Sequence, residues 1–111
     1  MSATALVAGA AQTASRIRDA AHFRPFRHAV DDFIRVLGSV PDRPAGTLTS
    51  DDLRTIELLG NDVIDRIEDR VDGLKSAADA QELVKAVYEI RRLLEEANRF
   101  RQHYFATARP V

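Results

Sequence analysis

The chain has 111 residues, of which 45% are hydrophobic and 30% charged, and its formal net charge is −1. Such a chain fits one domain with a core of its own, and its composition excludes a disordered protein. It contains no cysteine, which excludes disulfides and thiolate chemistry and fits a reducing compartment, so the cytoplasm is the expected location. No apolar run reaches the roughly 18 residues of a membrane span, and no membrane association is expected.

The charge is unevenly distributed along the chain. Residues 1–30 hold four arginines against one acid, residues 31–82 hold thirteen acids against six bases, and residues 83–111 hold six bases against three acids. An acidic middle between basic ends can pair internally or attract partners of opposite sign. Internal pairing is the simpler interpretation.

A first helix is predicted over residues 3–22. Small or apolar side chains recur at helical spacing but offer little bulk to a core: Leu6, Ala10, Thr13 and Ile17. Pro25 disfavours helical angles at the residue before it, so Arg24 is expected to separate this helix from the next or to kink the two together. Residues 1–24 are therefore expected either to pack loosely or to be kinked against the following helix.

A second helix is predicted over residues 25–38. Pro25 falls where a first helical turn tolerates it, and Gly38 falls where helices commonly end. The apolar residues step by four and three: Phe26, Val30, Phe33, Leu37 and Val40. Residues 39–48, SVPDRPAGTL, are expected to form a loop.

A third helix is predicted to begin after Thr49. Thr49 is a good N-cap, and Leu48 and Leu53 on either side of it form a hydrophobic staple. The side predicted to be buried contains Leu53, Ile56, Gly60, Val63, Ile67, Val71 and Leu74. Gly60 in the middle of a helix permits either close packing or a kink.

The last helix is predicted from about residue 79 to 106, with Asp79 and Glu82 as a capping box. Its apolar rows are Leu83, Val87, Ile90, Leu94, Ala97 and Tyr104, and beside them Ala86, Leu93 and Phe100. Gly73 and Ser76 indicate a tight turn before it. The sequence therefore predicts an all-α fold, a three- to four-helix bundle built around a long antiparallel αα-hairpin over about residues 50–106, with residues 1–111 as a single domain.

Carboxylates are concentrated in NDVIDRIEDRVDG, residues 61–73. We call four of them the acidic stripe: Asp62, Asp65, Asp69 and Asp72. They lie mainly opposite the predicted buried side, and Asp62 precedes Arg66 by four residues, which favours an ion pair. A solvated face is the preferred interpretation. A cation site, which needs oxygens from several elements, and a docking surface for a basic partner are the alternatives.

Two short segments resemble known functional motifs. FRPFRH resembles the Arg–His motif of HEPN-type ribonucleases, in which four to six residues separate the two, although only three separate Arg24 from His28. TSDDLRTIELLG resembles the phosphoacceptor segment of histidine-kinase dimerisation domains, although Asp51 stands in place of the phosphorylated histidine and Ile56 in place of proline. The resemblances imply a helical ribonuclease-like or phosphotransfer-like regulator as a further alternative.

Basic and aromatic residues alternate in two places, which we call the basic-aromatic segments: residues 22–28 and 98–105. Arginine beside aromatic rings suits the stacking of bases and the binding of phosphate. The candidate nucleic-acid contacts are Arg24, Arg27, His28, Arg99, Arg101 and His103. The alternative is that the aromatic rings belong to the core and the arginine heads extend into solvent, and this interpretation is favoured.

The sequence indicates a non-catalytic bundle that acts through protein–protein contact, with no cofactor and no metal. Leu58, Tyr88 and Phe105 lie outside the main buried rows and would add to an exposed apolar patch, which soluble monomers rarely tolerate. We therefore expect self-association as a homodimer, or binding to an unknown protein partner. The alternative hypothesis is a small nucleic-acid-associated regulator that uses the two basic-aromatic segments.

Overall fold

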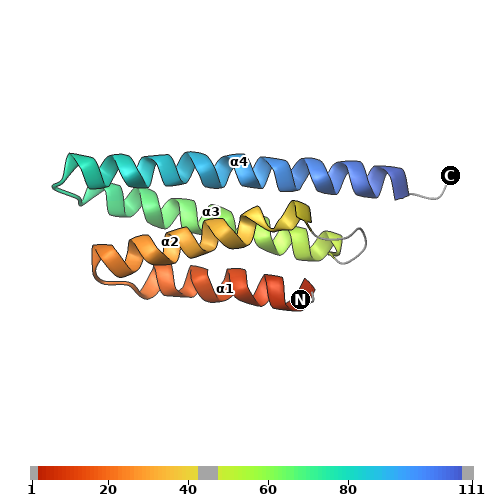
Figure 1. Ribbon diagram of the computed structural model, residues 1–111, viewed down its shortest axis with the longest axis horizontal. Helices are drawn as coiled ribbons and strands as arrows, with labels where there is room; N and C mark the ends of the chain where they lie inside the picture. The colour runs from red at the N-terminus through yellow and green to blue at the C-terminus, as the bar shows by residue number, and fades with distance from the viewer. Residues whose placement is uncertain (1–2, 43–47, 109–111) are drawn as a thin grey trace.

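The computed structural model describes the backbone of residues 3–42 and 48–108, and the side chains of residues 5–42 and 48–99. Within this part of the chain there are four α-helices, one turn of 3-10 helix and no strand (Figure 1). The elements are α1 (Ala3–Asp19), α2 (Phe23–Gly38), η1 (Val40–Asp42), α3 (Ser50–Asp72) and α4 (Ala77–Ala108). The predicted all-α bundle with its long second hairpin is confirmed.

The helices form two antiparallel hairpins, α1–α2 and α3–α4, that pack side by side (Figure 1). Between the hairpins, α1 packs against α3 and α2 packs against α4. Because successive helices alternate in direction, α1 runs in the same direction as α3, and α2 runs in the same direction as α4. The end of α2 and the start of α3 therefore lie at the same end of the bundle, and η1, with Val40 fully buried, packs there against α2 and α4.

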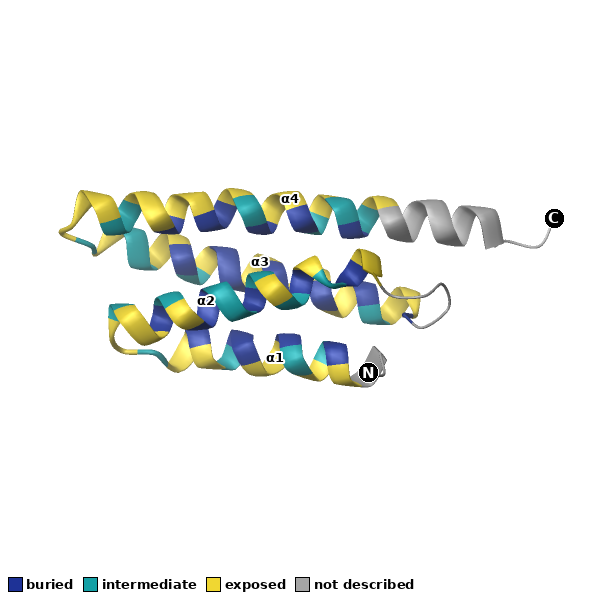
Figure 2. Ribbon diagram, viewed as in Figure 1, coloured by how far each residue is buried: buried dark blue, intermediate teal, exposed yellow. Residues whose placement is uncertain are grey.

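One stripe of each helix faces the interior, as the helical spacing of the apolar residues predicts (Figure 2). The α1 stripe combines small residues with Leu6 and Ile17 and is well covered, with Ala10 fully buried and Ile17 nearly so. The largest fully buried side chains are Phe26, Phe33, Ile17, Leu37, Ile56, Ile67, Leu83, Ile90, Val30, Val40 and Val63. They come from all four helices and η1, so the two hairpins share one core.

Gly60 marks a close approach of α3 to α4. A Cβ atom built on Gly60 would lie 2.7 Å from both terminal carbons of Leu94 and 3.1 Å from its Cγ. Carbon atoms normally approach to about 3.5–4.0 Å, so the Leu94 side chain occupies the space that a larger residue would need. Of the two possibilities for Gly60, close packing is the one that the structure shows.

The helix starts agree with the sequence at α3 and differ from it at α2 and α4. At α3 the Asp52 amide donates to Thr49 Oγ1 and the Thr49 amide donates to Asp52 Oδ2, both at 3.0 Å, which is the predicted N-cap extended to a capping box. At α4 the cap is Ser76, whose Oγ accepts from the Asp79 amide at 3.3 Å. The prediction of Asp79 as the cap was wrong by one turn.

The break between α1 and α2 lies earlier than predicted. It falls at residues 20–22, and α2 begins at Phe23 with His22 as its extended N-cap residue. Arg24 is helical, contrary to the expectation from Pro25. Pro25 is the third residue of α2, where its missing amide hydrogen has no carbonyl partner to lose.

Arg70 of α3 binds the segment between α1 and α2, residues 20–22. Its guanidinium donates to the carbonyl oxygen of Ala21 at 3.1 Å and to that of Ala20, and it lies 4.5 Å from the centre of the Phe26 ring. These carbonyls follow the end of α1, where helical partners are lacking. One side chain therefore links α1, α2 and α3.

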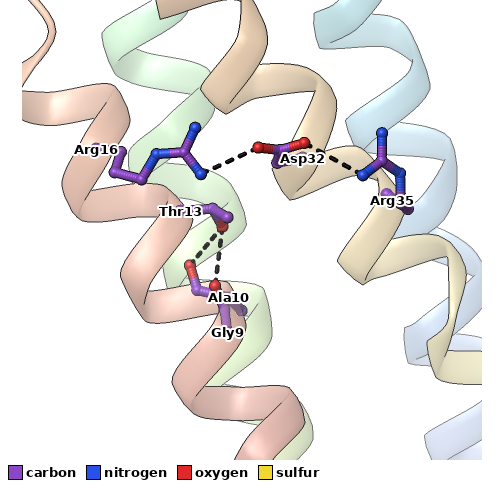
Figure 3. A network of polar contacts seen from close by, with 6 residues as sticks. All are labelled: Gly9, Ala10, Thr13, Arg16, Asp32 and Arg35. Atoms are coloured by element: carbon purple, nitrogen blue, oxygen red, sulfur yellow. Dashed lines mark hydrogen bonds and ion pairs between the residues drawn. The ribbon is translucent and has the colours of Figure 1, made fainter. Parts of the chain in front are cut away.

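A second polar link joins α1 to α2 (Figure 3). Arg16 of α1 donates to Asp32 Oδ2 at 3.0 Å, and Arg35 donates to Asp32 Oδ1 at 3.3 Å. The buried Thr13 hydroxyl lies within hydrogen-bonding distance of the carbonyl oxygens of Gly9 and Ala10, so it is satisfied inside α1. None of the helices in the described part of the chain has the combined length and apolar character that a membrane span demands.

Candidate interaction surface

A groove runs between α3 and α4 on the outside of the second hairpin, and we call it the α3–α4 groove. Its volume is about 240 Å³, and its apolar lining is Val71, Val84, Val87 and Tyr88. Glu68, Asp72 and Arg91 form its polar margin. Tyr88 is 68% exposed and Val84 is 42% exposed, which makes them two of the three large hydrophobic side chains exposed in the described part of the chain.

Local helix geometry places these side chains together. Val84 and Tyr88 are one turn apart on α4 and therefore lie on one face, beside the buried stripe that contains Val87. Across the groove, Arg91 of α4 reaches Glu68 of α3 at 3.4 Å and closes one part of the margin with an exposed ion pair. The result is an apolar strip between polar edges, an arrangement typical of surfaces that bind protein.

The sequence-predicted patch of Leu58, Tyr88 and Phe105 is not brought together as one surface by the described residues. Leu58 is 60% exposed but does not line the groove, and it precedes Glu68 by ten residues, or about 15 Å along α3. The Phe105 side chain lies outside the described side chains. The residue that sequence reasoning missed is Val84, and the signal for it was its four-residue spacing from Tyr88.

The two basic-aromatic segments lie at opposite ends of the bundle. Residues 22–28 form the start of α2, beside the α3–α4 turn, whereas residues 98–105 belong to the far part of α4 (Figure 1). Arg27 is held by Asp31 at 2.8 Å and lies 3.6 Å from Glu82 of α4. Phe26 is buried, Arg99 is exposed, and the side chains of Arg101 and His103 lie outside those that the structure describes.

Arg24 and His28 are exposed on one face of α2 and line a wider groove against α1, with a volume of about 640 Å³. Its other walls include Arg16, which is paired with Asp32, and Asp19, which is paired with Arg18 at 3.4 Å. This groove is larger than the α3–α4 groove. Arg16 and Asp19 are already paired within the chain, whereas Arg24 has no ion pair among the described side chains.

The acidic stripe is exposed at all four positions. Asp62 accepts from Arg66 at 3.1 Å, which is the ion pair that the spacing predicted. Within the described residues, no three histidine, aspartate or glutamate side chains are grouped as a metal ion would require. The observed pair and the exposure agree with the interpretation as a solvated face.

The most strongly perturbed charges lie on the outer side of α4. Arg92 donates to Glu89 at 3.2 Å and to Glu96 at 2.7 Å. The hydrogen bond from Arg92 holds the pKa of Glu89 below its usual range, and Glu89 in turn raises the pKa of Arg92. Arg92 is exposed and Glu89 is partly exposed, so the cluster lies on the helix surface and does not form a buried reactive site.

Comparisons with protein-family models, with curated proteins and with solved structures found no match for this chain.

Proposed function

We propose that this protein is a non-catalytic helical module that acts by binding protein through the outer face of the α3–α4 hairpin. The observation that carries the proposal is the exposure of Val84 and Tyr88 beside a groove with an apolar lining. Tyrosine in such a position is a frequent anchor of protein interfaces, because it buries a large ring and leaves its hydroxyl able to reach solvent. The absence of cysteine supports a cytoplasmic setting for this activity.

The other surfaces support a binding role less well. The grooves beside α1 include charged side chains, several of which pair within the chain: Arg16, Arg18, Asp19 and Arg66. Nucleic-acid binding would draw on the two basic-aromatic segments, which lie at opposite ends of the bundle with an acidic helix, α3, in between. That separation supports protein as the partner.

The experiment is site-specific photo-crosslinking in cells. A photoreactive phenylalanine analogue replaces Tyr88 in one variant and Leu58 in a matched control, since both positions are exposed and apolar but only Tyr88 lines the groove. Protein adducts at position 88 that are lost on Val84→Glu, with little reaction at position 58, are expected. Absence of adducts at position 88, or equal reaction at both positions, would overturn the proposed function.

A further inference from the structure

The exposed apolar residues of α4 are arranged so that a copy of the same helix can cover them. Val84 and Tyr88 are one turn apart, so a two-fold axis that passes between them places each Tyr88 on the Val84 of the other copy. Such an isologous contact buries both exposed residues of both chains. No second surface is needed to complete it.

The charges beside this pair decide the relative direction of the two helices. Lys75, Lys85 and Glu95 are exposed and have no ion-pair partner among the described residues. Parallel helices in register would set each of these charges against its own copy, which is repulsive. Antiparallel helices avoid this, because the lysines lie before Tyr88 and Glu95 lies after it.

The apolar pair also sets the register. With Tyr88 opposite Val84, Glu95 falls opposite Ala77, the first residue of α4 in the second copy, and Lys75 lies in the turn two residues before Ala77. Lys85 falls about 3 Å along the axis from Glu89 of the second copy, which is the acidic side of the Arg92 cluster. Placing Tyr88 opposite Tyr88 instead would bring Lys85 opposite Arg91, and these two positive charges repel. The charges therefore favour the register that places Tyr88 opposite Val84.

The size of the contact predicts a reversible association. From Ala77 to Arg99, α4 is about 34 Å long, and a helix about 10–12 Å wide offers a strip of about 400 Å². Stable interfaces bury about 800 Å² on each partner. A dimer that forms through this strip alone is therefore at the weak end of specific association, in the micromolar range.

We infer that a second copy of this chain is the partner of the α3–α4 face, with the two α4 helices antiparallel and Tyr88 of each copy seated on Val84 of the other. This rests on the proposed function, since it names the partner for the same surface. The juxtaposition of Glu95 with Lys75 of the second copy fixes the geometry.

The first test is the mass in solution, by sedimentation and light scattering, from about 10 µM to about 500 µM. The expected mass rises with concentration from the monomer value of 12.3 kDa towards twice that value. Tyr88→Glu should raise the dimer dissociation constant about tenfold or more, whereas the matched control Leu58→Glu should leave it unchanged. Circular dichroism checks that both variants keep the helical content of the parent.

The second test is a charge exchange across the axis. Glu95→Lys and Lys75→Glu should each weaken the dimer, and the double variant should recover the parent dissociation constant because the pair is restored with reversed signs. A double variant without recovery would overturn the antiparallel register. A monomer mass at every concentration would overturn the second copy as partner. Adducts to a different protein at position 88 would in that case leave the proposed function standing.

Discussion

The close approach at Gly60 allows a stability prediction whose sign depends on a single neighbour. Gly60→Ala adds a methyl group in the middle of α3 and gains about 1 kcal/mol of helix propensity. The new Cβ, at 2.7 Å from both terminal carbons of Leu94, overlaps them by about 1 Å. Overpacking of this kind costs about 1–3 kcal/mol. Leu94 is only half-buried and can turn aside, so a net loss of about 1 kcal/mol is expected.

Removing Leu94 should reverse the sign. Leu94→Ala alone should destabilise the protein by about 1–2 kcal/mol, less than a fully buried leucine would, because the side chain is only half-buried. In that background Gly60→Ala meets no obstacle and should stabilise by about 1 kcal/mol. The coupling between the two positions is then about 2 kcal/mol, well above the additivity of distant sites.

The assay is urea unfolding followed by far-UV circular dichroism at one fixed protein concentration, since self-association adds to apparent stability. A matched control is Gly9→Ala in α1, where a Cβ atom has nothing within 4 Å. This control should gain stability by about 1 kcal/mol in either background. If Gly60→Ala stabilised the parent as much as Gly9→Ala does, the packing of Leu94 on Gly60 would be refuted.

Three further outcomes are expected. Arg70→Lys should lower the free energy of unfolding by about 1–2 kcal/mol in the same assay, because lysine cannot donate to two carbonyls while covering a ring. The control Arg66→Lys should lower it by less than about 0.5 kcal/mol. Equal losses would contradict the contacts assigned to Arg70. The lowered pKa of Glu89 means that its ion pair contributes to stability above the ordinary carboxyl pKa and that this contribution is lost as the pH falls through the folded value. In an NMR titration Arg92→Gln should raise the Glu89 pKa, and an unchanged value would contradict the assigned cause. Oligonucleotide titrations should show only salt-sensitive binding with a dissociation constant above about 1 µM at physiological salt, and tighter binding that needs the arginines of both basic-aromatic segments would favour the nucleic-acid alternative.

The elements themselves were predictable because their signals are local. Four-three steps of apolar residues gave the buried sides of α2, α3 and α4, and the Thr49 cap followed from the residues around it. Ser76 and Asp79 are both good cap residues, so local preference could not choose between them. In the structure α4 begins at Ala77, and Ser76 Oγ accepts from the Asp79 amide.

The arrangement of the hairpins could not be predicted, since it depends on contacts between distant residues. Arg70 binds carbonyls 49 and 50 positions earlier in the chain, and no local pattern indicates those partners. The same holds for Leu94 over Gly60. Tyr88 was recognisable as lying off the buried rows, but the groove beside it exists only because Val71 of α3 lies across from Val84 of α4.

The measurement that tests the central claim most directly is a dilution series of amide spectra of the isotope-labelled protein. The claim is that a second copy of the chain binds the α3–α4 face, and it predicts concentration-dependent shifts at Val84, Tyr88 and Glu95, and none at Leu58 or Arg24. All of these side chains are exposed, so exposure alone does not separate them. Shifts centred on Leu58 or Arg24, or spectra that stay constant up to about 500 µM, where a micromolar dimer is well populated, would contradict the claim.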